Sequence, residues 1–382
     1  MEAAAASRRE PGTSDEKMEL LDIRKNTRPC RGLKRPTEIG HFSLDDQRAI
    51  YMDRREARRC VEVPGGDVRS LAWDLNEGFA DFQWRDDENI KTERLKPILE
   101  WIMANEQVLK KYPRVNFVVQ RGVMTDILTA PYEMDNKLGK EFRFKVCRFQ
   151  NTVYVCRDKE FQFTSFSSQG DREQHQTYWG YRFEGYITSH IEPEANEPSQ
   201  PNNSAGFNSV VLTGLGDHTF LLAAEIDGEL RASAQAPPLN YVELKTHRQL
   251  IGPTHRQHSF HRHKMLRTWA QSYAAGVPTA MIGFRDERGI VLNVKSYQVA
   301  DLPGMCKNYW SSFVCLNFAQ DFFDWLWKCI EETDPLQVQY EVTFQPELKR
   351  MTLRRVELSD TGQAILTPSF VDEMTVAAGG AK

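Results

Sequence analysis

Two short apolar segments of this chain carry charged side chains at alternate positions. One contains Glu225 and Asp227, and the next contains Glu243 and Lys245. Both segments are typical of β-strands, and on a strand the residues two apart point to the same side. The Pro-, Ala- and Gln-rich residues 228–239 form a connection that lets the two strands pair as neighbours. The pattern therefore predicts three carboxylates and one ammonium on a single patch.

Three carboxylates that share a patch without a counter-ion repel one another and raise one another's pKa. A hard divalent cation such as Mg²⁺ or Mn²⁺, bound through oxygen, relieves this repulsion. A metal ion beside a lysine is typical of enzymes that hydrolyse a phosphate ester or anhydride. The alternative interpretation is two half-exposed strands with solvated charges, because each short motif alone is common. Their presence on consecutive strands favours the metal site.

Three further side chains could complete such a site. Glu184, in the pattern Gly180-x-x-x-Glu184, lies in a segment predicted to be helical and can supply a fourth carboxylate. Arg121 follows an apolar strand predicted at 115–120, where its guanidinium could bind a phosphate. Gln271 lies on the polar side of a predicted helix, together with Lys264 and Arg267. Taken alone, each of these residues is also typical of a solvent-exposed position.

The elements that would position these side chains mix strands and helices. Strands are predicted at 115–120, 142–147, 152–156, 207–212, 219–227, 241–246, 280–284, 290–296, 338–345 and 351–357. Helices are predicted after Thr92, at 179–190, from Ser259 onward and at 314–330. This mixture predicts an α+β fold with mixed sheets and flanking helices. We expect a disordered tail at 1–35, one catalytic domain at 36–370 and a loose tail at 371–382.

Composition narrows the possible partners. The 382 residues carry a net charge of −4, so nucleic-acid binding requires a local basic patch rather than a global field. The seven cysteines form no C-x-x-C motif, which argues against a disulfide framework or a zinc knuckle. They are interpreted as reduced thiols of an intracellular protein. No window approaches 18 consecutive apolar residues, so no membrane span is predicted.

Taken together, these motifs resemble those of the decapping exoribonuclease (DXO) family, whose fungal members are nuclear partners of the 5′-3′ exoribonuclease. The resemblance extends over about residues 35–330. It is carried by Arg121-Gly122, Gly180-x-x-x-Glu184, Glu225-Ile226-Asp227, Glu243-Leu244-Lys245 and Gln271, with matching text such as Phe42-Ser43-Leu44-Asp45 and Trp269-Ala270-Gln271-Ser272.

The resemblance implies two mixed β-sheets flanked by helices, related to nucleases with an acidic pair and E-x-K. It implies two divalent cations, Mg²⁺ or Mn²⁺. Their ligands would be Glu184, Glu225, Asp227, Glu243 and the backbone carbonyl of Leu244. Lys245 and Gln271 would contact the scissile phosphate and the attacking water.

The resemblance also implies a substrate pocket. Its residues would be Arg48, Glu93, Gln120, Arg121, Gly122, Asn208, Glu225, Lys245 and Gln271. Gln120 and Asn208 stand where animal members have Trp and Cys. The segments 207–216 and 121–124 are more similar to the fungal members, which implies an exoribonuclease partner.

The implied function is a metal-dependent hydrolase that removes triphosphate, incomplete or NAD caps from RNA 5′ ends in quality control. A nuclear location and stimulation of a 5′-3′ exoribonuclease are implied with it. Two alternatives remain open at this point. One is a DNA exonuclease of the same acidic-pair class, and the other is a non-catalytic scaffold of an exoribonuclease.

Overall fold

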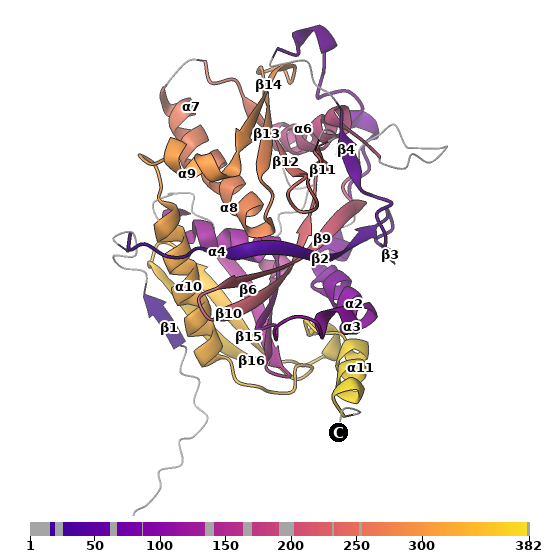
Figure 1. Cartoon of the computed structure of the whole chain (residues 1–382), viewed down its shortest axis with the longest axis vertical. Coiled ribbons are helices and arrows are strands. Elements are labelled where there is room, and N and C mark those ends of the chain that lie inside the picture. The colour runs from indigo at the N-terminus through magenta and orange to yellow at the C-terminus, as the bar shows by residue number, and fades with distance from the viewer. Residues whose placement is uncertain are drawn as a thin grey trace, which may run out of the picture.

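The fold is built on two β-sheets that meet near the middle of the molecule (Figure 1). The computed structural model describes residues 16–19, 26–61, 67–85, 87–133, 141–162, 170–190, 202–230, 233–251 and 254–379. Within those ranges, one sheet has ten strands and the other has six. None of the described helices is long and apolar enough to cross a membrane.

The larger sheet is mixed. Its strands, in spatial order, are β1 (Glu16–Glu19), β16 (Arg350–Glu357), β15 (Val338–Gln345), β6 (Phe142–Phe149), β7 (Thr152–Arg157), β5 (Phe117–Gln120), β10 (His218–Glu225), β9 (Gly206–Leu215), β2 (Lys34–Leu44) and β3 (Ile50–Tyr51). The central strand β5 runs parallel to both β7 and β10, and it is an unbroken apolar run at Phe117–Val119 because helices cover both of its faces.

The smaller sheet carries the second acidic motif. Its order is β14 (Val291–Gln298), β13 (Thr279–Arg285), β12 (Tyr241–Arg248), β11 (Gly228–Glu229), β4 (Arg58–Cys60) and β8 (Thr188–His190). Strand β12 is central and runs parallel to β13. Its alternation is strict at the motif, where Leu244 is buried among apolar side chains while Glu243 and Lys245 point to the opposite side.

Helices pack on both faces of the larger sheet and also on the smaller sheet. Their bounds are α1 (Asp87–Glu93), α2 (Lys96–Ala104), α3 (Glu106–Leu109), α4 (Arg121–Glu133), α5 (Lys159–Gln162), α6 (Asp171–Ile187), α7 (Thr254–Ser259), the π-helical turn η5 (Phe260–Lys264), α8 (Met265–Ala275), α9 (Leu302–Met305), α10 (Ser312–Cys329) and α11 (Pro368–Gly379), with short 3₁₀ turns η2 (Arg69–Leu71), η3 (Phe79–Asp81), η6 (Val299–Asp301) and η7 (Thr361–Gln363).

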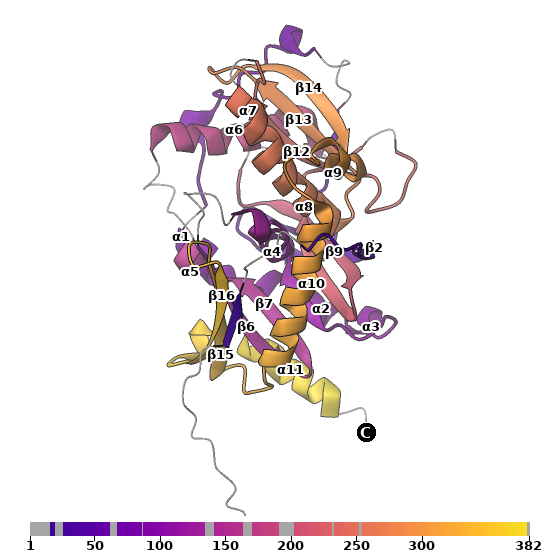
Figure 2. The ribbon, with the colours of Figure 1, turned by 90° about the vertical axis from the view of Figure 1, so that its left-hand side faces the viewer.

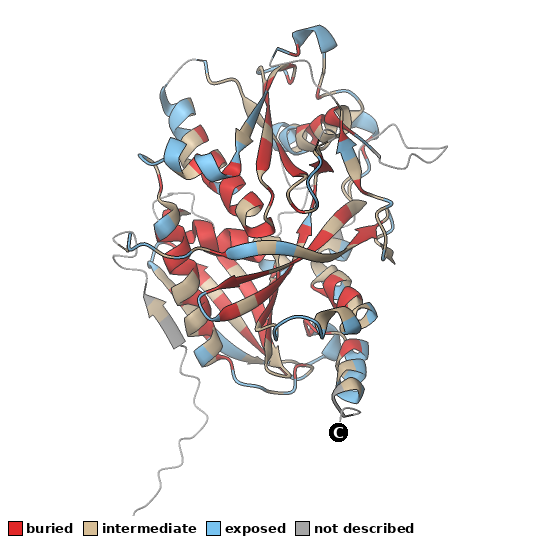
Figure 3. Ribbon diagram, in the orientation of Figure 1, coloured by how far each residue is buried: buried red, intermediate tan, exposed pale blue. Residues whose placement is uncertain are grey.

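The main hydrophobic core lies between α4, α8, α10 and one face of the larger sheet. Helix α10 runs alongside that sheet in both views (Figure 1, Figure 2). Helices α2 and α11 cover the opposite face. Buried residues therefore concentrate along α4, α10 and the central strands (Figure 3). Helix α6 packs on the smaller sheet, where Phe183 lies in a cluster with Val242 and Leu244.

The two acidic strands are not neighbours in one sheet, which corrects the sequence-based expectation. Strand β10 belongs to the larger sheet and β12 to the smaller one. Both edges of β10 are already paired, with β5 and β9, so no position beside it is open to β12. After Glu225 the chain instead crosses to the smaller sheet, where β11 pairs with β12. Asp227 lies at this crossing.

The structure also differs from the expected disordered and loose tails. Residues 26–35 lie against α10, because the Asn317 amide donates to the carbonyls of Asn26 and Arg28 and Arg28 pairs with Asp321 at 3.1 Å. Strand β1 pairs with β16. At the other end, residues 371–379 belong to helix α11, and Val371 and Met374 pack against the apolar cluster beside α2. Residues 1–15, 20–25 and 380–382 lie outside the described residues.

Several helix boundaries differ from those expected. Helix α4 was not predicted, and it begins at Arg121 where the sequence indicated only the end of a strand. Helix α6 begins at Asp171, before the start expected at residue 179, and ends at Ile187. The helix expected from Ser259 begins earlier, at Thr254, and passes through the π-turn η5. The Pro at position 97 lies in the first turn of α2, where its missing N–H costs nothing.

Candidate active site

Carboxylates from the larger sheet, from the crossing between the sheets and from helix α6 line one cavity of about 450 Å³, whereas Glu243 of the smaller sheet pairs with Lys245 without lining that cavity. The end of β10 supplies Glu225, and the crossing between the sheets supplies Asp227. Helix α6 contributes Glu184, and β12 contributes Lys245. Gln271 of α8 lines the same cavity, so the structure brings these predicted residues together even though their strands lie in different sheets.

Lys245 connects the acidic groups of the two motifs. Its Nζ lies 2.5 Å from Oε1 of Glu243 and 3.6 Å from Oδ2 of Asp227. It also donates to the backbone carbonyl of Leu244 at 2.9 Å. The Leu244 N–H donates to Oδ2 of Asp227 at 2.7 Å, which fixes the crossing segment onto β12. The ammonium therefore contacts two of the four predicted carboxylates and the predicted carbonyl ligand.

Glu243 is held by two cations. Arg121, the first residue of α4, donates from Nη1 to Oε2 of Glu243 at 2.7 Å, on the side away from Lys245. The Glu243 side chain is only 1% exposed. Burial opposes its ionisation, but Arg121 and Lys245 together hold its pKa below the ordinary value. Glu243 is therefore a buried, ionised carboxylate.

Glu184 and Asp227 have the opposite character. Burial and repulsion from Asp227 and Glu225 raise the pKa of Glu184 well above its ordinary value. Burial and repulsion from Glu243 raise the pKa of Asp227 to about 6, although Lys245 and Arg121 lower it in part. Both acids therefore lack sufficient positive charge around them.

This donor set fits a hard divalent cation. Of the four predicted carboxylates, Glu243 and Asp227 form ion pairs with Lys245 or Arg121, and all the side-chain donors of the set are oxygen atoms. Among the described residues, no three His, Cys, Asp or Glu side chains are already arranged as a metal centre. The reason is visible in the ion pairs, because Glu243 is turned to Arg121 and Lys245. The raised pKa values of Glu184 and Asp227 indicate the charge that an ion would neutralise.

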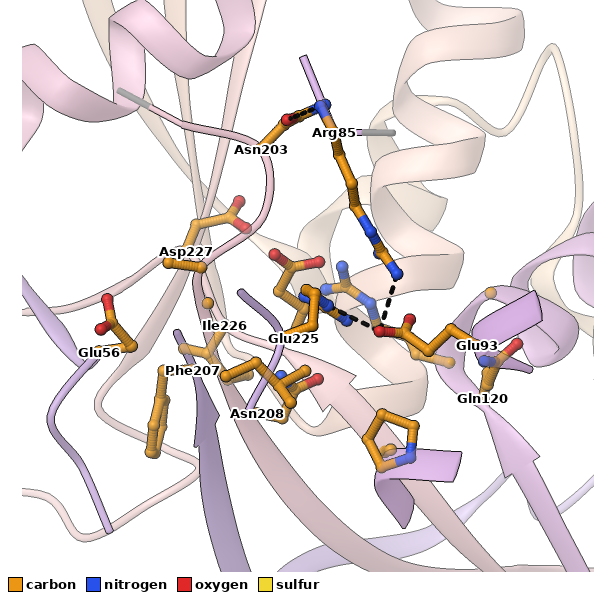
Figure 4. A pocket seen from close by; sticks show the side chains of 18 of the residues that line it. Glu56, Arg85, Glu93, Gln120, Asn203, Phe207, Asn208, Glu225, Ile226 and Asp227 are labelled. Carbon is orange, nitrogen blue, oxygen red and sulfur yellow. Dashed lines mark hydrogen bonds and ion pairs between the residues drawn. The ribbon is translucent and has the colours of Figure 1, made fainter. Parts of the chain in front are cut away.

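Opposite the carboxylates, the cavity wall is a charged network around Glu93 (Figure 4). Glu93 accepts from Nε of Arg48 at 2.7 Å and pairs with Arg85 at 2.8 Å. Lys159 lies 4.0 Å from its other oxygen. Burial raises the pKa of Glu93, but Arg48 and the other cations lower it further, so the net shift is downward. Three cations surrounding one carboxylate leave this wall positively charged.

The remaining predicted substrate residues also reach the cavity, and each has a distinct contact. Gln120 ends β5, and its amide donates to the Arg94 carbonyl at 2.8 Å. Asn208 of β9 lies opposite Glu225 in the sheet register. A Cβ on Gly122 would lie 2.6 Å from the guanidinium of Arg157, so a larger residue there would have to displace that guanidinium.

Sequence patterns did not reveal all the cationic residues of the cavity. Those missed include Arg58, Arg85, Arg94, Arg157 and Lys159. They come from connections and element ends with no periodic pattern. Lys264, in contrast, was recognisable, because it shares a helix side with Gln271 in the sequence.

Comparison with known proteins places this geometry in a family. A family model described as RAI1 like PD-(D/E)XK nuclease matches residues 34–371. The chain belongs to the RAI1-like PD-(D/E)XK nuclease family. In this chain, Asp227 and Glu243-Leu244-Lys245 follow the order of the acidic residue and the (D/E)XK triplet in that description. The structure shows them joined by Lys245, as described above.

Curated members of this RAI1-like family are similar over most of the chain. A decapping nuclease RAI1 of Aspergillus fumigatus is 32% identical over 361 residues, which cover 89% of this chain and 93% of that protein. A decapping and exoribonuclease protein of Xenopus laevis is 32% identical over 328 residues, covering 81% and 80%. The similarity to fungal and animal relatives is therefore equal in identity.

Solved structures share the fold. Rai1 of Scheffersomyces stipitis, in complex with (3′-NADP)⁺ and calcium ion, has a TM-score of 0.79 at 22% identity and covers 96% of this chain and 99% of that chain. Rai1 of Candida albicans, in complex with pU5-Mn²⁺, has a TM-score of 0.79 at 23% identity and covers 95% and 100%. The expected α+β fold of two mixed sheets is confirmed.

Proposed function

We propose that this protein is a metal-dependent nuclease that removes groups from the 5′ end of RNA. The curated relatives with this family's motifs are decapping nucleases. Two structural neighbours were solved with a short RNA and manganese and with a dinucleotide and calcium. The substrates would be RNA ends that carry a triphosphate, an incomplete cap or an NAD cap.

The carboxylates of Glu184, Glu225, Asp227 and Glu243 and the carbonyl of Leu244 would hold Mg²⁺ or Mn²⁺. When bound, the metal supplies an activated water and a Lewis acid for the phosphoryl oxygen. Arg121 keeps Glu243 ionised and oriented.

Lys245 and Gln271 act on the substrate itself. The ammonium of Lys245 lies among the carboxylates, where it offsets the negative charge that develops on the phosphate during in-line attack. The Gln271 side chain faces the cavity and orients the attacking water or a phosphate oxygen. Neither role requires either residue to lose a proton.

The opposite wall recognises the 5′ end. Arg48, Arg85 and Lys159 place positive charge around a cavity whose volume is suited to a nucleotide-sized group. Binding through these side chains makes affinity fall as salt concentration rises.

One observation carries this proposal. Glu184 and Asp227, whose pKa values are raised, line the same cavity as Lys245. The test is a double variant, Glu225→Ala with Asp227→Ala, assayed on 5′-triphosphate RNA with Mn²⁺. We expect product release to fall at least about a thousandfold while the melting transition is retained.

The matched control changes two exposed acids of α11, Asp372→Ala with Glu373→Ala, and should leave the rate unchanged. If the variant with Glu225→Ala and Asp227→Ala, here called the cavity variant, keeps wild-type activity, the proposal is wrong. Mass analysis of products from RNAs with triphosphate, unmethylated-cap and NAD ends identifies the preferred group. Duplex DNA, assayed in parallel, tests the alternative of a DNA exonuclease.

A nuclear location and stimulation of a 5′-3′ exoribonuclease are further parts of the proposal. Both rest on the resemblance of residues 207–216 and 121–124 to the fungal members of the family. A pure exoribonuclease should digest RNA faster in the presence of this chain. If the cavity variant stimulates it as well as the wild type does and no hydrolysis is measurable, the scaffold alternative holds instead.

A further inference from the structure

A second cavity adjoins the metal-site residues. It measures about 260 Å³ and shares Tyr181, Glu184 and Lys245 with the main cavity. Its other walls come from α6, β12 and the π-turn η5, through Gln176, Thr177, Gly180, Leu244, Thr246 and Lys264. The metal-site acid Glu184 and the cation Lys245 therefore stand where two cavities meet.

Lys264 is the cation of this second cavity. Within the described residues, its ammonium makes no hydrogen bond or ion pair, and the residue is half-buried. Burial and the nearby charges of Lys245, Arg285 and Arg267 lower its pKa to about 8, and Glu243 compensates only in part. A partly desolvated ammonium without a counter-ion is unfavourable, and an anion from outside would offset that cost.

The π-turn accounts for the position of Lys264. A π-helical turn adds one residue to the helix, and such turns are frequent at functional sites. Here the turn η5 lies between α7 and α8, and Lys264 is its last residue. Gln271 on the following helix lines the main cavity, while Lys264 lines the second.

Space for a ligand comes from Gly180. It lies one helical turn before Glu184 on α6, so both residues are on the same face. A Cβ at Gly180 would meet no atom within 4 Å. Packing therefore does not require glycine at this position, and the missing side chain keeps the second cavity open.

We propose that the second cavity binds a phosphate group of the same substrate through Lys264, next to the phosphate at the metal site. The inference rests on the proposed function. It extends that function by giving the substrate chain a path through both cavities, with Lys245 at the reacting phosphate and Lys264 at its neighbour. The neighbouring phosphate belongs either to the RNA chain on the 3′ side or to the 5′ group that is released.

Binding gives the first test, because it does not depend on catalysis. Fluorescence anisotropy of a short labelled 5′-triphosphate RNA, without divalent metal, measures Kd over a range of salt concentrations. Each lost phosphate contact to a single strand lowers the salt slope by about 0.7. We expect Lys264→Met to lose about this slope and to bind roughly tenfold more weakly, with Lys264→Arg close to wild type.

The control is Lys307→Met, because Lys307 is an exposed lysine outside both cavities. It should retain the wild-type slope. Lys264→Met should also retain the wild-type melting temperature or exceed it, because it removes a desolvated charge without breaking a described ion pair. An unchanged salt slope in Lys264→Met, with RNA still bound, overturns the inference.

Substrate changes then identify the phosphate. In one arm, a neutral methylphosphonate replaces the first internucleotide phosphate. In the other arm, a 5′-diphosphate replaces the triphosphate. Wild type should bind one of these RNAs more weakly, and Lys264→Met should no longer distinguish it from the parent RNA. If each substrate change weakens RNA binding by Lys264→Met as much as it weakens binding by the wild type, Lys264 does not contact that phosphate.

The two proposals fail in different ways. If the wild type binds RNA but does not hydrolyse it, the proposed function is overturned while the salt-slope test still decides the role of Lys264. If the wild type binds no 5′-phosphorylated RNA, both are overturned.

Discussion

At the residue scale, three of the four carboxylates of the site fall into two electrostatic classes. Glu243 is kept ionised by Arg121 and Lys245. Asp227 and Glu184 are driven towards the protonated form, chiefly by burial and then by neighbouring acids. The metal-free protein therefore stores unfavourable charge that a divalent cation relieves, and metal binding must displace protons at moderately acidic pH.

Asp227 gives this a measurable pH dependence. In the folded protein its pKa is about 6, above the ordinary value of 3.8. Because the folded-state pKa is raised, the folded protein retains the proton longer than the unfolded chain does. The contribution of Asp227 to metal-free stability is therefore greatest below about pH 4 and is lost, by at most roughly 2–3 kcal/mol, as the pH rises through about 6. Stabilisation by added Mg²⁺ or Mn²⁺ should be small at about pH 5 and large above pH 6.

The matched variant is Asp227→Asn, which can still accept the hydrogen bond from the Leu244 N–H. Without metal, the melting temperatures of the two proteins should diverge as the pH rises from about 4 to 7. The melting temperature of the wild type should fall relative to that of Asp227→Asn. A difference that stays constant over this range contradicts the assigned charge state. The same variant should lose most of the stabilisation by metal.

At the element scale, two glycines with opposite surroundings test how the site is positioned. Gly122, in the first turn of α4, lies against Arg157, whose guanidinium is fixed by two bonds to Asp126 at 2.7 and 2.8 Å. Gly122→Ala should cost about 1–3 kcal/mol and reduce activity, because it displaces the helix start that carries Arg121.

Gly180→Ala should act in the other direction on stability. Its Cβ meets open space in the middle of α6, so the change should add about 0.5–1 kcal/mol through helix propensity. Urea denaturation of both variants measures the contrast. Equal destabilisation by the two substitutions would show that the packing around Gly122 or Gly180 is not as described.

The elements also show what the sequence could and could not predict. The two-residue spacing of Glu225 with Asp227, and of Glu243 with Lys245, identified the site because a strand fixes which side chains share a face. The sheet to which each strand belongs depends on which edges are free, and this is a tertiary property. The sequence around Arg121 suggested a strand end only, and α4 was missed although it is almost entirely buried.

Other parts of the site depend on contacts far apart in sequence. Arg85 and Lys159 join the cavity only because both approach Glu93. The side of the helix that carries Lys264 was predicted, but not the π-turn that ends there or the second cavity beside it. No local pattern encodes these approaches, because they are fixed by the packing of elements rather than by spacing.

At the scale of the whole molecule, the site exists only where the two sheets are joined. A buried polar cluster lies at this junction. Glu38 of β2 belongs to the larger sheet and accepts a hydrogen bond from the hydroxyl of Tyr241 of β12, in the smaller sheet, at 2.7 Å. It also accepts a hydrogen bond from the hydroxyl of Ser209 of β9 at 2.6 Å. Arg54 approaches Tyr241 and Glu38 and forms an ion pair with Glu229 of β11. This cluster sets how the acids of one sheet meet those of the other.

Tyr241→Phe tests that role. Losing a hydrogen bond to a buried charged group should destabilise the protein by about 1.5–3 kcal/mol and lower the hydrolysis rate, although Tyr241 is not among the residues lining either cavity. Chemical denaturation and rate measurements check both effects. The exposed Tyr112→Phe is the control and should change neither. If Tyr241→Phe is as stable as the wild type, the hydrogen bond between Glu38 and Tyr241 does not hold the two sheets together as described.

The central claim is that acids from two sheets and one helix hold a common divalent ion. The most direct test is a crystal structure of the protein with Mn²⁺, analysed by anomalous scattering at the manganese edge. We predict an anomalous peak in the main cavity, with carboxylate oxygens of at least three of Glu184, Glu225, Asp227 and Glu243 about 2.0–2.4 Å from it. Clear density for these side chains with no manganese peak among them would contradict the account.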